Sequence, residues 1–234
     1  MSSEQLSHLL KDYLTRPEFR PSCSVLSITY DYIDDYLYRI AQPRDLLLQK
    51  MEEEADSGAV PIIGPLVGRL LYNLARSSES KNVLEIGTAI GYSGIWLGRA
   101  VAPFKGTVTT IDKDPERVKR AKHNIAEAKL QKVIKVLEGD ALKILPTLKD
   151  DYDLVFLDSD KNIYIDAFKL SVKKLRKGGL FLADNTLWGG DVAKGGKSEL
   201  TQTMIKFNKE VSSYPGLSTV IIPLRDGVLV SLKE

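Results

Sequence analysis

Residues 82–94 read NVLEIGTAIGYSG and determine the fold that we expect for this chain. The short apolar run at 82–86 ends in Gly87, and the stretch from Gly91 onward, GYSGIWLGRAV, reads as a helix. A buried strand that passes through a glycine turn into a helix is the first unit of a parallel α/β sheet.

The same alternation of strand and helix continues along the chain. We expect four further strands, which read GTVTTID (106–112), KVIKVLEGD (132–140), DLVFLD (153–158) and GLFLADN (179–185). Asp114 and Pro115 predict the N-cap and the first turn of a helix between two of these strands. An apolar stripe from Ile165 to Leu175 predicts a later helix that stops at Gly178.

The two ends of the chain complete the expected architecture. Residues 1–80 read as mostly helical, and residues 217–233 read as two strands joined by an Asp-Gly hairpin turn. Parallel strands joined by helices require right-handed crossovers and a sheet that is buried on both faces. We therefore expect a single domain over 1–234. It would hold a Rossmann-like α/β sandwich (81–234), with a seven-stranded, mostly parallel sheet and an antiparallel hairpin at its end, and extra N-terminal helices.

Composition restricts the classes of function. Hydrophobic residues make up 43% of the 234 residues and charged residues 27%, which is ordinary for a globular protein with a sizeable core. The net charge of +2 provides no electrostatic attraction to nucleic acid or to a membrane surface. Cys23 is the only cysteine, which excludes an intramolecular disulfide framework and a thiolate metal cluster. The first residues lack the apolar core of a signal peptide, and no apolar run approaches about 18 residues, so we expect a cytoplasmic protein.

Acidic residues mark the ends of three successive strands, which is where an open parallel sheet binds its ligands. Glu85 precedes Gly87 by two residues, and a carboxylate there suits a ligand with an ammonium or sulfonium group better than a pyrophosphate. Asp112 can accept hydrogen bonds from both hydroxyls of a ribose, and residues 138–141 are placed to border an adenine. Taken singly, each feature is more simply a turn or a helix cap, but their occurrence at successive strand ends favours a nucleoside site.

Three oxygen-bearing side chains follow the next two strands. Asp158 ends the fourth strand, and Asp184 and Asn185 end the fifth. Two carboxylates and an amide oxygen select a hard cation, Mg²⁺ first, with Mn²⁺ or Ca²⁺ as alternatives. From the spacing alone, a helix cap and a turn explain these residues equally well.

Lys161 follows Asp158 by three residues, in the first turn of the next helix, where a positive charge is unfavourable. Taken alone, such a lysine is simply solvated. The segments before residue 60 and after Trp188 would shape the pocket of any second substrate, with Trp188 as an aromatic wall and a flexible loop beyond it.

Several of these stretches resemble the motifs of the metal-dependent small-molecule O-methyltransferases, a family that includes catechol and caffeoyl-CoA O-methyltransferases. The resemblance runs from about Ile33 to the C-terminus, and its motifs read VLEIGTAIGYSG, TTIDKDP, GDA, VFLDSDKNIY, ADNTLWGGDV and PLRDGVLVSLK. It implies the class I methyltransferase fold, S-adenosylmethionine as cofactor, a small hydroxylated aromatic acceptor with vicinal hydroxyls, and a homodimer.

The resemblance also implies roles for individual residues. The implied cofactor-binding residues are Ile63, Glu85, Gly87, Ser93, Asp112, Ala141, Asp158 and Asp160. The implied metal ligands are Asp158, Asp184 and Asn185, and Asp158 would also serve catalysis. Lys161 would be the general base, since a nearby cation and sulfonium would favour its neutral amine.

Three rival functions remain to be compared with this one. Residues 190–198 read GDVAKGGKS, close to a P-loop, but the glycine spacing is one residue too long and the order relative to the aspartate-bearing strand is wrong. A methyltransferase that acts on nucleic acid or protein would call for a basic stripe or a recognition domain, and neither is visible. A cofactor-binding protein without catalysis would not need the residues Asp158 and Lys161.

Overall fold

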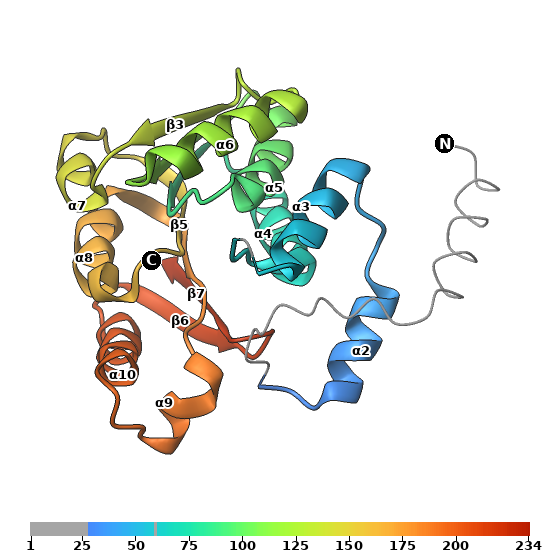
Figure 1. The fold of residues 1–234 in the computed structure, drawn as a ribbon. Helices are drawn as coiled ribbons and strands as arrows, with labels where there is room; N and C mark the ends of the chain where they lie inside the picture. Colours follow the sequence, from blue (N-terminus) through green and yellow to red (C-terminus); the bar gives the residue numbers. More distant parts are fainter. Residues whose placement is uncertain (1–27, 59) are drawn as a thin grey trace.

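A seven-stranded sheet forms the centre of the computed structural model, which describes residues 28–58 and 60–234 (Figure 1). Its strands are β1 (Asn82–Ile86), β2 (Thr107–Asp112), β3 (Ile134–Glu138), β4 (Tyr152–Leu157), β5 (Leu175–Ala183), β6 (Leu217–Ile222) and β7 (Val228–Lys233). They lie in the order β3-β2-β1-β4-β5-β7-β6. The first five are parallel, whereas β7 runs antiparallel to β5 and to β6. The predicted fold class is confirmed, and Cys23 lies outside the described residues.

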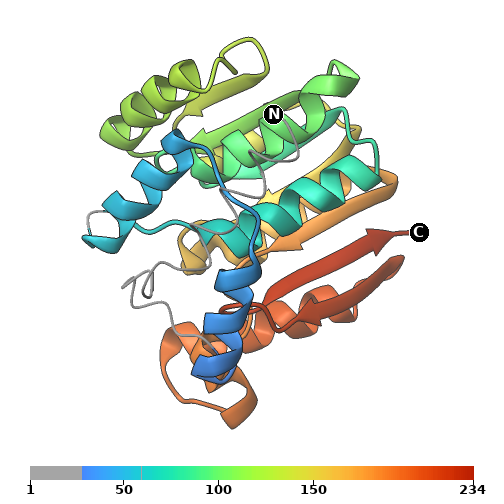
Figure 2. The same cartoon turned by 90° about the vertical axis from the view of Figure 1, so that its right-hand side faces the viewer.

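Helices cover both faces of this sheet, so the molecule has three layers (Figure 2). One face packs against α3 (Leu46–Asp56), α4 (Gly64–Ser77), α5 (Tyr92–Val101) and α6 (Pro115–Glu127). The other packs against α7 (Ala141–Ile144), α8 (Tyr164–Lys174) and α10 (Glu199–Ser212). The faces alternate along each strand: Val83 of β1 belongs to the first core and Leu84 to the second. Burial on both faces explains why the parallel strands are continuous apolar runs.

Local sequence signals set most of the helix boundaries. The carboxylate of Asp114 accepts hydrogen bonds from the first-turn amides of Glu116 and Arg117, and Pro115 is the first residue of α6, as predicted. The predicted end of the next long helix is wrong. α8 ends at Lys174, and Gly178 lies inside β5 with a φ of +71°. The chain passes from α8 into β5 without a connecting loop, so a glycine inside a strand resembled a helix C-cap.

The segments at the periphery differ more from the sequence-based picture. α2 (Asp31–Ile40) is helical as expected but buries none of its residues, and it stands away from the sheet (Figures 1 and 2). The predicted flexible loop after Trp188 contains a 3₁₀ turn (Trp188–Gly190) and a short helix, α9 (Asp191–Lys194), before α10. No helix within the described residues is long and apolar enough to cross a lipid bilayer.

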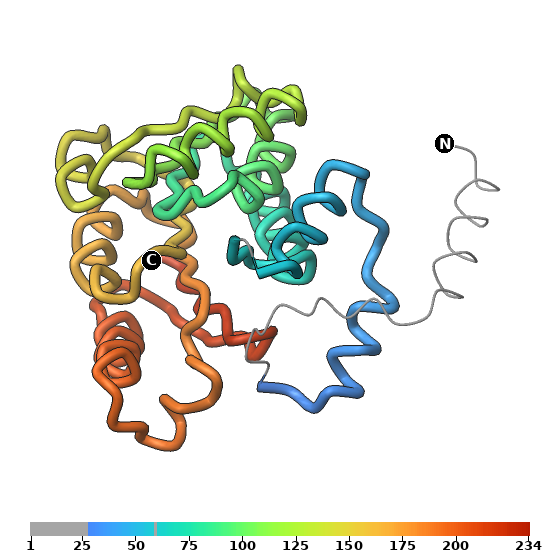
Figure 3. The backbone as a smooth tube through the Cα atoms, in the orientation of Figure 1, coloured from blue at the N-terminus to red at the C-terminus, as the bar shows by residue number. Residues whose placement is uncertain are grey.

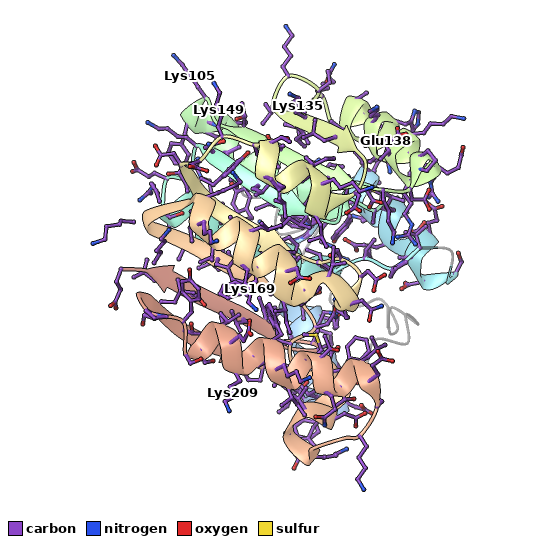
Figure 4. The ribbon with its side chains drawn as sticks, turned by 90° about the vertical axis from the view of Figure 1, so that its left-hand side faces the viewer. Lys105, Lys135, Glu138, Lys149, Lys169 and Lys209 are labelled. Carbon is purple, nitrogen blue, oxygen red and sulfur yellow. The ribbon has the colours of Figure 1, made fainter. Side chains whose placement is uncertain are left out.

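Charged side chains are spread over the outer surface rather than gathered on one element. Five of the six residues labelled in Figure 4 are lysines, and they project outward from different segments of the chain. These residues are Lys105, Lys135, Lys149, Lys169 and Lys209. This spread fits the small net charge of +2.

Candidate active site

The carboxyl ends of the parallel strands meet at one edge of the sheet, and the loops that follow β1, β2, β4 and β5 lie together there (Figure 3). The strand order reverses between β1 and β4, so this edge contains the switch point at which α/β sheets bind ligands.

The loop after β1 depends on Gly87. Its φ is +105°, and a Cβ built at this position would lie 1.8 Å from the carbonyl oxygen of Asp158. Any side chain would therefore separate the loop after β1 from the loop after β4. Gly91, with φ +87°, then turns the chain into α5.

Glu85 is a fully buried carboxylate at this edge. Neither of its oxygens has a hydrogen-bond partner in the described part of the chain. Burial raises the pKa of Glu85 to about 7, against the opposing influence of the nearby hydroxyls of Ser93 and Thr110. A buried acid that lacks a partner is a place where a ligand with a donor or a positive charge fits.

Asp112 ends β2 and is half-buried. Its Oδ2 accepts a hydrogen bond from the amide of Ala89 at 2.8 Å, and its Oδ1 accepts one from the amide of Asp114 at 3.0 Å. A carboxylate has about four acceptor positions, so Asp112 can hold the loop after β1 and still bind a ligand hydroxyl. The sequence did not indicate that Asp112 holds the loop after β1.

The other predicted cofactor residues take different positions. Ala141 is buried at the start of α7, and Ile63 is buried immediately before α4. Asp160 is exposed; it accepts a hydrogen bond from the amide of Asn162 and lies 3.8 Å from the ammonium of Lys113. Among the described residues, no hydrogen bond connects Ile63 or Ala141 to Glu85 or Asp112, and their roles toward a cofactor stay predictions.

Lys161 is the centre of a buried polar cluster. Its Nζ donates to Asn185 Oδ1 at 2.8 Å and to Asp158 Oδ1 at 3.3 Å, and also to the hydroxyl of Tyr164. The Lys161 side chain is 10% exposed. The alternative of a solvated surface lysine is therefore excluded.

Asp184 completes this cluster from the end of β5. It is 4% exposed, and its Oδ1 has no hydrogen-bond partner among the described residues. Burial first, and then the negative charge of Asp158, raises the pKa of Asp184. No three His, Cys, Asp or Glu side chains within residues 28–58 and 60–234 are grouped to hold a metal. A metal at this cluster would therefore rest on Asp158, Asp184 and the amide oxygen of Asn185, a donor set that fits a hard cation.

Two polar residues of this region were missed by the sequence reasoning. The fully buried Tyr164 donates to the carbonyl of Asp184 at 3.1 Å and accepts from Lys161. Asp226, 4% exposed, accepts from the amide of Gly189 and so holds the loop that carries Trp188. The position of Tyr164, three residues after Lys161 and so nearly one helical turn away, was an available signal. Asp226 was interpreted only as part of a hairpin turn.

Comparison with known proteins agrees with this geometry. The profile described as O-methyltransferase matches residues 45–234. The catechol O-methyltransferase of Niastella koreensis is 32% identical over 199 residues, which cover 82% of this chain and 88% of that protein. The O-methyltransferase of Bacillus cereus, solved in complex with SAH, superposes with a TM-score of 0.79 at 26% identity, covering 87% of this chain and 97% of that one. TomG of Streptomyces achromogenes, involved in tomaymycin synthesis and solved with SAM, gives a TM-score of 0.78 at 28% identity, covering 87% and 96%. This chain belongs to the O-methyltransferase family.

Proposed function

We propose that this protein transfers the methyl group of S-adenosylmethionine to one hydroxyl of a small aromatic molecule with two adjacent hydroxyls, with the help of a divalent cation. The observation that carries the proposal is the cluster around Lys161, in which a buried ammonium lies 2.8 Å and 3.3 Å from oxygens of Asn185 and Asp158. A structural lysine would not require a second carboxylate, Asp184, with one oxygen that lacks a partner among the described residues, in the same cluster.

The cofactor would occupy the edge formed by β1 and β2. Glu85 offers a buried carboxylate to the ammonium of the methionine moiety, and Asp112 offers its free lone pairs to the ribose hydroxyls. SAH and SAM are bound by the two relatives whose structures were compared, which supports the same choice of cofactor here.

The acceptor would lie against the Lys161 cluster. Asp158, Asp184 and Asn185 would hold a divalent cation, which would supply a Lewis acid that lowers the pKa of the acceptor hydroxyl. Lys161 receives the proton of that hydroxyl at Nζ, and for this its ammonium must first lose a proton to solvent. The acceptor oxygen then attacks the methyl carbon in line with the departing thioether, and the protein holds both reactants in that orientation.

The test is a methyl-transfer assay with catechols and the matching monophenols, with and without EDTA. We expect catechols to react far better, because two adjacent oxygens fix the ring where one does not. We expect EDTA to abolish turnover until Mg²⁺ or Mn²⁺ is restored. Equal rates on catechols and monophenols in EDTA would contradict this mechanism, whereas the assignment to the family would stand.

A homodimer in the cytoplasm belongs to the same proposal, and light scattering of the purified protein tests its stoichiometry.

A further inference from the structure

Arg225 is a buried cation in the turn between β6 and β7. It is 8% exposed, and its Nη1 donates to the carbonyl oxygen of Ile62 at 3.2 Å. Among the described residues this is its only side-chain hydrogen bond, and no carboxylate there lies within ion-pair distance of it. A guanidinium has five N–H donors, so most of its donors have no partner among residues 28–58 and 60–234.

The turn itself does not require an arginine at this position. Arg225 has a φ of +52°, a left-handed conformation that costs about 1 kcal/mol for a residue with a Cβ and nothing for glycine. Space for its guanidinium exists because Gly64, at φ +70°, has no side chain: a Cβ there would lie 2.6 Å from Nη1. The left-handed backbone at Arg225 is strained, and its Nε and Nη2, which have no partner among the described residues, are not buried away from solvent, so they can meet a ligand.

Arg225 lies between the segments that were expected to shape the acceptor pocket. Its carbonyl accepts from the amide of Ile28, and the side chain of the next residue, Asp226, holds the amide of Gly189 beside Trp188. Figures 1 and 2 place the β6–β7 turn beside the segment that leads into α2.

The charges around Arg225 agree with this location. Burial raises the pKa of Tyr38 on α2, and the positive charge of Arg225 opposes this rise. The guanidinium is therefore within electrostatic range of α2.

We propose that Arg225 selects acceptors that carry a carboxylate in addition to their two hydroxyls. A guanidinium matches a carboxylate with two parallel charged hydrogen bonds, which neither Trp188 nor the Lys161 cluster can offer. The inference rests on the proposed function, because it concerns the same acceptor pocket.

The experiment compares 3,4-dihydroxybenzoate with 3,4-dihydroxybenzamide, which share the diol and differ in charge. The quantity of interest is the ratio of their kcat/KM values. We expect Arg225→Gln to lower this ratio by about tenfold to a hundredfold, through KM rather than kcat, because the carboxylate is remote from the reacting oxygen. Arg225→Lys should keep part of the preference. Both acceptors are measured on the same protein sample, so a loss of folded enzyme lowers both rates and leaves the ratio unchanged.

The matched control is Arg176→Gln. Arg176 pairs with Asp153 at the opposite end of the strands, so its loss changes the net charge equally and should not change the ratio. Calorimetric affinity for S-adenosylhomocysteine should change less than threefold in Arg225→Gln. A tenfold loss of that affinity at an unchanged ratio would assign Arg225 to the carboxylate of the cofactor and overturn the proposal.

Direct binding separates this inference from the proposed function. Affinity of 3,4-dihydroxybenzoate, measured by calorimetry with S-adenosylhomocysteine present, needs no turnover. If binding depends on Arg225 but the wild type methylates neither acceptor, the inference stands and the proposed reaction fails. If both are methylated at a ratio that Arg225→Gln does not change, the reaction stands and the inference fails.

Discussion

Burial of Glu85 in the folded protein opposes the ionisation of its carboxyl group. Its pKa of about 7 is above the ordinary 4.5, so the folded protein without ligand holds a proton that the unfolded chain releases between these values. Stability should therefore fall by about 3 kcal/mol as pH rises from 4.5 through 7, and the whole loss is present at higher pH. We expect Glu85→Gln to remove the part of the pH dependence that Glu85 contributes, as measured by urea unfolding without cofactor at pH 5 and pH 8, while the part contributed by the buried Asp184, whose pKa is also raised, remains. The exposed Glu127→Gln is the control, and an unchanged pH dependence in Glu85→Gln would show that Glu85 is charged in the folded protein throughout.

Lys161 has its three N–H groups directed at three different oxygens, so its position is set more strictly than a surface lysine would need. We expect Lys161→Ala to lower turnover by roughly 10²–10⁴-fold, the range typical of a lost general base, with little change in cofactor affinity. Lys169→Ala, an exposed lysine on α8 that pairs with Glu210, should keep full turnover. If Lys161→Ala keeps most of its turnover at neutral pH, another group accepts the proton.

At the scale of elements, α3 carries two ion pairs of very different burial: Glu52 pairs with Arg44 just before the helix, and Glu54 pairs with Arg120 of α6. The carboxylate of Glu52 accepts hydrogen bonds from Arg44 Nη2 and from the hydroxyl of Tyr92, both at 2.6 Å. In this ion pair the side chain of Glu52 is 3% exposed and that of Arg44 is 5% exposed. The pair between Glu54 and Arg120 is 42% and 37% exposed. We expect Glu52→Ala to lower the free energy of unfolding by about 3 kcal/mol, and Glu54→Ala by less than about 1 kcal/mol. Equal losses in denaturant unfolding would mean that burial does not decide the strength of these pairs.

The same scale shows what the sequence could predict. Strands such as β1 and β4 were evident because burial on both faces makes them continuous apolar runs, and the N-cap at Asp114 is a local signal. The acidic residues at the ends of the parallel strands could be placed at one edge of the sheet, because the carboxyl ends of parallel strands lie at the same edge. The task of Asp226 could not be predicted, because its partner Gly189 is 37 residues away and no local pattern connects them. The direct passage from α8 into β5 was missed because Gly178 resembles a helix end.

At the scale of the whole molecule, ligand binding should stabilise the fold, because Glu85 and Asp112, on different strands, come together only in the folded chain. At a hundredfold excess of S-adenosylhomocysteine over its dissociation constant, we expect a stabilisation of about 2.7 kcal/mol, or roughly 5–11 °C in Tm. Asp112→Ala should weaken binding by about 1–3 kcal/mol through lost charged hydrogen bonds, and at the same ligand concentration it should lose about one third to nine tenths of this shift. Thermal unfolding with and without ligand measures both proteins. An undiminished shift in Asp112→Ala would remove the ribose contact from the proposed site.

The missing side chain at Gly87 has a consequence for how this enzyme could change its chemistry. Because the loop after β1 lies directly against the carbonyl of Asp158, the distance between the proposed cofactor and acceptor sites would follow from the spacing of two adjacent strands, about 4.8 Å. Side chains around the acceptor can then be exchanged, in evolution or by design, without a change in the distance between the two proposed sites. The backbone then fixes this distance, and the choice of acceptor depends on other residues along the sheet edge.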